Sequence, residues 1–368
     1  MEGLIKGKVV ENGNVMQGIR KIYTNPDLKS HTVLTDDVFT YIDFYFKKHN
    51  KKLFDANGLS LKQNFIFYWN QSKNFYNATK ILPVEASPLP MYYSMLNASK
   101  AYMLYCAKDV EDAVGNLKNH GIHEGVVLSQ EKVELSNIYV YRTQKGVFSQ
   151  FSKMLDPNFD EKMKYGKENK YSLKEIIKNL PYVHSAYIST YDLKRREEKF
   201  LPMNVGDIPK FCYCNDRKIH LVVELQKKYF KRNAVVIPKE ILGQIPDDFE
   251  VSQDDAFCLI SKKGFHKKDL KDEYEIYRKH FAFISANDRL WYLKKKYFPC
   301  DIFDLSATFA ITHRLSEIVR YKPEQMVELL KGKENWLIHE FLTMALDHFI
   351  DGIACEISKK EIMHTRYK

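Results

Sequence analysis

The sequence lacks long apolar runs and export signals. No stretch of about 18 consecutive apolar residues occurs in the 368-residue chain, so a membrane-spanning helix is not expected. Residues 1–10 lack the charged, apolar and small-residue order of a signal peptide. We therefore expect a cytoplasmic protein that does not associate with a membrane.

Closely spaced cysteines are also rare. Of the six cysteines, only Cys212 and Cys214 form a close pair, and a CxC spacing differs from that of zinc-binding pairs. If this run is a strand, both thiols share one face, but two ligands do not complete a zinc site. The thiols are expected to be reduced, and neither a metal nor a cofactor is expected.

Motifs of several enzyme classes are missing. The chain contains no Walker A sequence, GxGxxG, HExxH or GxSxG. The doubled acids Asp247-Asp248 and Asp254-Asp255 flank short loops and are interpreted as solvated turn residues. Whether the protein is an enzyme stays open, with a non-catalytic function preferred.

The composition is that of a globular protein, and its positive charge is concentrated in one segment. Hydrophobic residues make up 45% of the chain, enough to exclude an extended disordered chain. The net charge is +10, and residues 161–300 hold 29 Lys and Arg against 20 Asp and Glu. Nearly all of the basic character therefore belongs to this middle segment, where any nucleic-acid binding is expected to reside.

Hydrophobic periodicity divides the chain into three parts, residues 1–160, 161–300 and 301–368. The first and last parts show helical spacing, with Pro83 ending one helix and residues 83–90 predicted to be non-helical. Asp301 and Asp304 are predicted to cap a helix. The middle part contains short β-type runs at residues 184–190, 211–215, 219–225, 233–238 and 256–263.

These patterns predict an α+β fold that is predominantly α. Helices from both ends of the chain form one core, and the basic mixed segment is inserted between them. We expect the helices of residues 60–106 to pack directly on those of residues 305–353.

Two stretches carry a resemblance to a known family. The first comprises residues 69–78, residues 88–104 and the pair His120-Gly121, and the second comprises residues 315–323 with Arg320-Tyr321. Together they resemble the YaaC-like family, a largely uncharacterised group, over most of the chain.

Residues 91–105 and the His120-Gly121 turn also resemble HEPN domains. Those domains are helical bundles of toxin, defence and RNA-processing proteins, so the resemblance implies a HEPN-like core and, by analogy only, a role in stress or phage defence. Active HEPN ribonucleases carry Arg and, after four to six intervening residues, His. No such pair occurs here. The resemblance thus supports the fold more than ribonuclease activity.

His120 and Arg320 are the candidate catalytic residues. His120 could act as a general base or contact phosphate, but with Gly121 it could also form a helix C-cap. Arg320 could bind phosphate through its planar guanidinium or pair with Glu317. We predict that Arg320 is at least partly buried and bonded to a carboxylate or to a carbonyl near His120.

A polar cluster is predicted around these residues. His313, Glu317 and Arg320 share one helix face, which could be a buried polar network or the lining of a cleft. The other proposed members are Asn97, Lys100 and Tyr321. For Lys100, a solvated position with a buried stem is the alternative.

Basic residues interleaved with aromatics form a predicted nucleic-acid-binding surface. Cations neutralise phosphates and aromatic rings stack on bases, although such charge runs are also typical of solvated faces. The residues are Lys227, Lys228, Arg232, Lys294, Lys295 and Lys296.

The leading functional hypothesis is a non-catalytic RNA-associated or partner-binding protein of YaaC-like type. The first alternative is a metal-independent HEPN-like endoribonuclease that uses His120 and Arg320. The second alternative is a homodimeric interaction scaffold. A cleft that contains both His120 and Arg320 would favour the enzyme.

Overall fold

Two compact units make up the chain. The computed structural model describes residues 3–29, 32–49, 60–107, 118–125, 132–230, 234–285, 289–296, 298 and 300–364. Residues 35–192 and 299–358 form what we call the helical unit, and residues 1–34, 193–298 and 359–368 form the sheet unit.

The boundaries of these units differ in part from the predicted segments. The second boundary lies at 298/299, close to the predicted 300/301, whereas the first lies at 192/193 instead of 160/161. Both chain ends join the sheet unit because strand pairing holds them there. Strand β1 (Lys6–Val9) pairs with β9 (Lys210–Cys214), and β15 (Ile362–Met363) pairs with β4 (Val33–Leu34).

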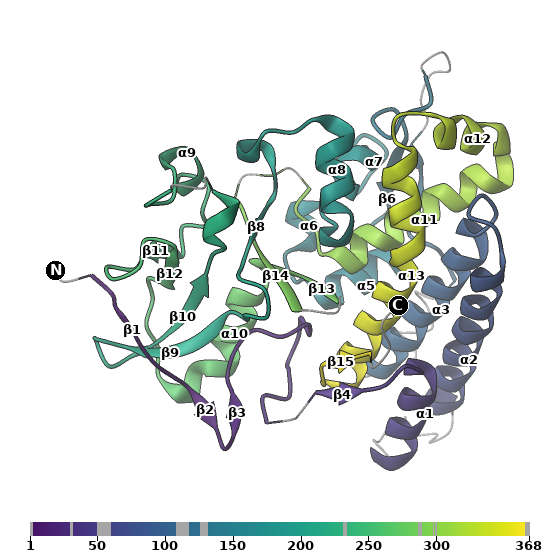
Figure 1. Cartoon of the computed structure of the whole chain (residues 1–368). Coiled ribbons are helices and arrows are strands. Elements are labelled where there is room, and N and C mark those ends of the chain that lie inside the picture. Colours follow the sequence, from purple (N-terminus) through teal and green to yellow (C-terminus); the bar gives the residue numbers. More distant parts are fainter. Residues whose placement is uncertain are drawn as a thin grey trace. The chain divides into compact units, whose positions relative to one another are not determined.

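The helical unit is built around α3 (Pro88–Cys106), and 13 of its 19 residues are buried. α2 (Ser60–Ile81), α11 (Asp304–Tyr321) and α13 (Asn335–Ser358) pack against it, and α1 (Val38–His49) lies on α13 (Figure 1). Small side chains allow close approach, and Ser94 Oγ donates to the Ser72 carbonyl of α2 over 2.9 Å. The predicted packing of helices from the two ends of the chain is confirmed.

Shorter elements complete the helical unit. The strands β5 (Ile122–Gly125), β6 (Tyr139–Arg142) and β7 (Tyr171–Ser172) form a small antiparallel sheet. The remaining helices are α5 (Val147–Leu155), α6 (Phe159–Lys162), α7 (Leu173–Ile177), α8 (His184–Tyr191) and α12 (Pro323–Lys331).

Three local predictions were wrong. Residues 184–190 form α8 and not a strand, because packing on α13 overrides their β propensity. α3 begins at Pro88 within the stretch predicted to be non-helical, since proline is tolerated in a first helical turn. The predicted capping of this helix by Asp301 and Asp304 was also wrong, because Phe303 occupies the cap position of α11. Asp304 is the first helical residue, and it pairs with His348 at 2.9 Å.

The sheet unit contains two antiparallel sheets. The larger has the strand order β1-β9-β10-β12-β11, and the smaller has the order β13-β14-β8. Strands β10 (Ile219–Glu224) and β12 (Cys258–Ser261) match two predicted β runs, while residues 234–238 form no strand. The other elements are β2 (Glu11–Asn12), β3 (Val15–Met16), β8 (Phe200–Pro202), α9 (Lys239–Leu242), β11 (Phe249–Val251), α10 (Leu270–Arg278), β13 (Phe281–Ser285) and β14 (Arg289–Lys294).

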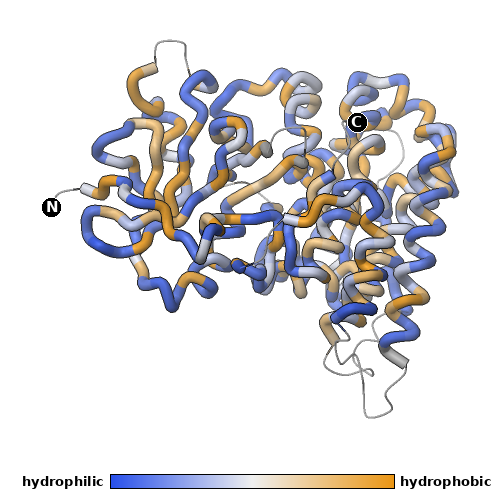
Figure 2. The backbone as a smooth tube through the Cα atoms, turned by 60° about the horizontal axis from the view of Figure 1, so that its bottom comes forward, coloured by the Kyte–Doolittle hydropathy of each residue, from blue (hydrophilic) through white to orange (hydrophobic). Residues whose placement is uncertain are grey.

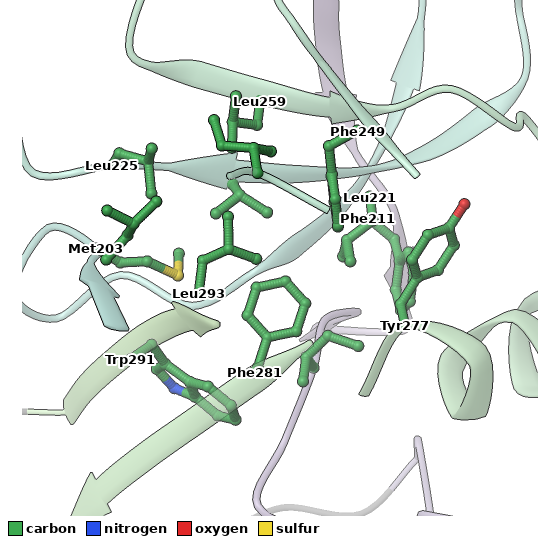
Figure 3. Packing of buried hydrophobic residues seen from close by; sticks show 14 of the residues in the cluster. Met203, Phe211, Leu221, Leu225, Phe249, Leu259, Tyr277, Phe281, Trp291 and Leu293 are labelled. Atoms are coloured by element: carbon green, nitrogen blue, oxygen red, sulfur yellow. The ribbon is translucent and has the colours of Figure 1, made fainter. Parts of the chain in front are cut away.

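The core of the sheet unit lies on one face of the larger sheet. Phe211, Leu221 and Leu259 extend from its strands toward Phe281 and Leu293 of the smaller sheet (Figure 3). Alternate residues of a strand point to opposite faces, so this single face supplies an apolar layer. Burial of this layer is the main source of the unit's stability.

The opposite face of the same sheet carries thiols. Cys212, Cys214 and Cys258 are buried there, which confirms that the CxC pair shares one face. Burial raises the pKa of Cys212 and Cys214 to about 11 and that of Cys258 to about 12, so the thiols are protonated at neutral pH. Within the described ranges, no three metal-ligand side chains are arranged to hold an ion.

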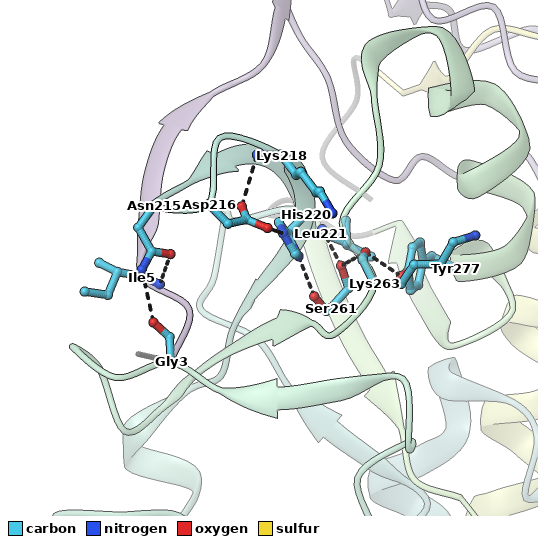
Figure 4. A network of polar contacts seen from close by, with 10 residues as sticks. All are labelled: Gly3, Ile5, Asn215, Asp216, Lys218, His220, Leu221, Ser261, Lys263 and Tyr277. Atoms are coloured by element: carbon cyan, nitrogen blue, oxygen red, sulfur yellow. Dashed lines mark hydrogen bonds and ion pairs between the residues drawn. The ribbon is translucent and has the colours of Figure 1, made fainter. Parts of the chain in front are cut away.

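A polar network closes the hairpin of β9 and β10 (Figure 4). The His220 ring lies between the Ser261 carbonyl oxygen, 2.6 Å from Nδ1, and the Asp216 carboxylate, 3.1 Å from Nε2. The Leu221 amide donates to Ser261 Oγ over 2.9 Å. These bonds satisfy buried polar groups, so His220 is a structural histidine.

Hydrophobic and hydrophilic residues alternate along the long helices (Figure 2). None of the helices in the described part of the chain has both the length and the apolar character needed to cross a bilayer.

Candidate functional site

A cleft of about 680 Å³ lies in the helical unit. It is formed by one face of α11, by residues 118–123 and by the loop after β6. Tyr92 of α3 contributes to it as well. The cleft brings together His120, His313, Glu317, Arg320 and Tyr321, all of which were predicted as site residues.

The position of His120 is fixed by its backbone. The amides of Val147 and Phe148, in the first turn of α5, donate to the carbonyls of Asn119 and His120 over 2.9 Å. The predicted C-cap role is therefore wrong for the described residues 118–121, which are not helical and instead cap the start of α5.

Two glycines allow this arrangement. Gly121 has φ +83° and Gly146 has φ +112°, conformations that residues with a Cβ rarely adopt. A Cβ on Gly121 would lie 3.0 Å from the Gly146 carbonyl carbon. The close approach of these two backbones places His120 beside α3 and α11.

Three aromatic rings meet at the inner end of the cleft. The ring centroids of Tyr92 and His313 are 4.9 Å apart, and those of His120 and His313 are 5.9 Å apart. Burial, followed by the charges of His120, His123 and nearby arginines, holds the pKa of His313 well below its usual value of 6.5. Burial and the charge of Lys100 also lower the pKa of His120. Both imidazoles therefore favour the neutral form.

The carboxylate of Glu317 is bound by Arg314, whereas the sequence suggested Arg320. Arg314 is buried and lies 3.3 Å from Glu317 and 2.5 Å from Glu124 of β5. Burial raises the pKa of Glu317, and Arg314 partly offsets this effect. Burial likewise disfavours the charge of Glu124, but ion pairs with Arg314 and Lys322 lower its pKa overall.

The prediction that Arg320 is at least partly buried and bonded to a carboxylate or to a carbonyl near His120 was wrong. Arg320 lies in the last turn of α11 with its side chain exposed, and its guanidinium is 4.8 Å from the ring centroid of Tyr321. Because the Glu317 carboxylate is already paired with Arg314, the Arg320 cation stays solvated at the rim of the cleft. It is nevertheless close enough to lower the pKa of His120 and of His313.

Asn97 and Lys100 do not line the cleft. The Asn97 amide donates to the Tyr93 carbonyl over 2.7 Å within α3. Lys100 is half-buried, burial lowers its pKa, and its Nζ lies 5.2 Å from the ring centroid of Tyr68. The positive charge of Lys100 disfavours protonation of His120 and so helps to lower its pKa.

The cleft includes residues that the sequence did not single out as a site. They are Tyr92, Lys118, Asn119, Ile122, His123, Thr143, Lys145 and Ser316. Tyr92 lies within residues 88–104, which resemble the YaaC-like family, and could have been selected on that basis. Lys118 and Lys145 lie in polar stretches that carry no recognisable motif, and only the fold brings both to the rim of the cleft.

The predicted nucleic-acid surface of the sheet unit is only partly at the surface. Lys227 and Lys228 are exposed, but Lys294 and Lys295 are only 5% and 3% exposed. Lys295 Nζ donates to the Arg195 carbonyl over 2.6 Å, and Lys296 pairs with Asp247. A surface role is therefore wrong for Lys294 and Lys295, and Arg232 lies outside the described residues.

The charges of the cleft are predominantly positive. Lys118, Lys145 and Arg320 are exposed at its rim, and Glu317 is its only lining carboxylate among the described residues. Because Arg314 already offsets Glu317, the cleft is suited to an anionic ligand.

The fold and cleft define an α+β protein with a cationic cleft in its helical unit. The chain matches the model of the YaaC-like protein family over residues 36–357. It therefore belongs to the YaaC-like family. No curated protein and no solved structure matches the chain.

Proposed function

We propose that this protein is RNA-associated and that its cleft binds the phosphates of single-stranded RNA. The observation that carries the proposal is the charge of the lining. Among the described lining residues, Lys118, Lys145 and Arg320 are exposed cations, and Glu317 is the one carboxylate and is bound by Arg314. Cations on a concave surface supply the salt-dependent part of RNA affinity.

An exposed aromatic ring at the rim supports the same proposal. Tyr321 is 67% exposed and lies against the guanidinium of Arg320. Unpaired bases stack on such rings, and each stacked base contributes roughly 1–3 kcal/mol to binding. Arg320 and Tyr321 together would hold a phosphate and its neighbouring base.

The test is fluorescence anisotropy of a labelled single-stranded RNA measured over a range of salt concentrations. Arg320→Ala should weaken binding without lowering the melting temperature, because the side chain is exposed. Lys118→Ala and Lys145→Ala should each reduce the slope of log K against log salt by about one. The matched control is Lys331→Ala, an exposed lysine of α12 that does not line the cleft and should leave the RNA affinity unchanged. Unchanged affinity in all three cleft variants would refute the proposal.

A second candidate is a metal-independent endoribonuclease, because His120 and Arg320 line the same cleft. Neutral His120 would remove the proton of a ribose 2′-hydroxyl, whose oxygen attacks the adjacent phosphorus. The bond to the 5′-oxygen breaks, that oxygen takes up a proton, and a 2′,3′-cyclic phosphate forms. Arg320 would stabilise the added negative charge on the phosphorane.

Cleavage of RNA in the presence of EDTA, with a cyclic-phosphate product, tests this second candidate. His120→Gln should abolish the product while RNA binding persists. If the wild-type protein binds RNA and leaves it intact, the non-catalytic proposal stands and the nuclease is excluded.

We further propose that the helical unit is a HEPN-like bundle of a cytoplasmic protein acting in stress or phage defence. The packing of α2, α11 and α13 around α3 and the motif of residues 91–105 support this proposal. Survival of phage-infected cells that express wild-type protein or Arg320→Ala is the test. A homodimeric scaffold is the remaining alternative, and light scattering on the purified chain tests it.

A further inference from the structure

The inner end of the cleft contains two buried polar atoms without hydrogen-bond partners in the described part of the chain. They are the Tyr92 hydroxyl and His313 Nδ1, on side chains that belong to residues only 1% and 4% exposed. Glu317 lies 3.7 Å from His313 Nδ1, beyond hydrogen-bond distance. A buried polar atom that lacks a hydrogen-bond partner is unfavourable, so a ligand that forms hydrogen bonds with these two atoms gains affinity.

The inner wall carries fewer charges than the rim, and Glu317, the one carboxylate among the described lining residues, is bound by Arg314. Burial holds the pKa of His313 well below 6.5 and raises that of Tyr92, so both favour the uncharged form. Ile122 and Ser316, which also line the cleft, are buried and uncharged. The exposed cations Lys118, Lys145 and Arg320 lie at the rim.

This distribution indicates the kind of ligand. A ligand that matches it has an uncharged polar group at the inner end and an anionic group at the rim. A compact polyanion matches poorly, because the buried cation of α11, Arg314, already has its two Nη groups bound to Glu124 and Glu317. The volume of about 680 Å³ is in the range of pockets that bind small organic ligands.

We infer that the inner end of the cleft holds one unstacked nucleobase of the RNA whose phosphate lies at the rim. The inference rests on the proposed RNA binding. Single-stranded RNA is read through bases that leave the stack and form hydrogen bonds on their edges. The Tyr92 hydroxyl and His313 Nδ1 form those bonds, and the cations of the rim bind the attached phosphate.

The inference is tested by calorimetry with AMP, CMP, GMP and UMP, with ribose 5-phosphate as a ligand that lacks the base. Wild-type protein should bind at least one nucleotide roughly tenfold more tightly than ribose 5-phosphate. Tyr92→Phe keeps the ring that packs on Phe309 and removes only the unpartnered hydroxyl. This variant should bind that nucleotide three- to tenfold more weakly, and its affinity for ribose 5-phosphate should be unchanged.

The control is Tyr102→Phe, a second buried tyrosine of α3 that does not line the cleft. It should leave all affinities unchanged. Equal binding of ribose 5-phosphate and every nucleotide, the absence of nucleotide binding, or equal losses in the two tyrosine variants would overturn the inference. Failure of the proposed RNA binding is a separate result, in which Arg320→Ala changes the affinity of no phosphorylated ligand.

Discussion

Arg314 of α11 and Glu124 of β5 form an ion pair of 2.5 Å between residues 190 positions apart in the sequence. The same guanidinium reaches Glu317 at 3.3 Å, so one buried cation links α11, which carries His313, to β5, which begins two residues after His120. This pair holds two sides of the cleft together.

Loss of Arg314 should destabilise the protein. Arg314→Ala leaves Glu317 without its partner, and the free energy of unfolding should fall by about 1.5–3 kcal/mol, the usual range for hydrogen bonds to charged groups. Urea denaturation provides the measurement. Glu124→Gln keeps an acceptor for Arg314 and should cost less. If the two variants are equally stable, the ion pair does not hold the cleft together.

The contact between Gly121 and Gly146 should resist any added side chain. Gly206 offers a matched comparison, because its φ is +82° and a Cβ there would meet no atom within 4 Å. Both Gly121→Ala and Gly206→Ala incur the cost of positive φ, about 1 kcal/mol. In Gly121→Ala the added Cβ would also lie 3.0 Å from the backbone of Gly146, which must move away, so the melting temperature of this variant should fall further. Equal melting temperatures would show that the glycine contact is loose.

The stability of the protein should depend on pH through His313. Burial first, and then nearby cations, lower its pKa in the folded state, whereas the pKa in the unfolded chain is about 6.5. The unfolded state therefore binds more protons below about pH 6.5. The stabilising contribution of neutral His313 is full above that pH and is lost as pH falls toward the lowered pKa.

Urea denaturation at several pH values should detect this effect. His120 and His123 have lowered pKa values and add to the slope, while the raised pKa of Glu317 acts in the opposite direction. Replacing His313 with Gln should reduce the slope between pH 5 and pH 7. His49→Gln, at an exposed position in α1, is the control and should leave it unchanged. If the free energy of unfolding of His313→Gln depends on pH as steeply as that of the wild type, other groups cause the pH dependence.

Two lysines of the sheet unit should respond differently to replacement. Lys295 is buried and donates to the Arg195 carbonyl, so Lys295→Ala should lower the free energy of unfolding by about 1.5–3 kcal/mol. Lys228 is exposed, and Lys228→Ala should change it by at most about 0.5 kcal/mol. Chemical denaturation compares the two. Similar small losses would mean that the Lys295 side chain is not held in place.

Much of the architecture follows from local patterns. The 3.6-residue periodicity predicted α1, α2, α11 and α13, and strand-type runs predicted β9, β10 and β12, because the faces that bury apolar side chains are encoded locally. The short segment 184–190 was mispredicted, since a few β-branched and aromatic residues suit either a strand or a packed helix.

By itself, the sequence determined that His313, Glu317 and Arg320 share one face of a helix, and it placed His120 in a stretch that resembles the YaaC-like family. Only the tertiary structure decided which arginine binds Glu317, which lysines are buried and which cations surround the cleft. Helical spacing makes both Arg314 and Arg320 possible partners of Glu317. The placement of β5 beside α11 brings Glu124 to Arg314, so the desolvated cation gains two carboxylates there while Arg320 stays in water.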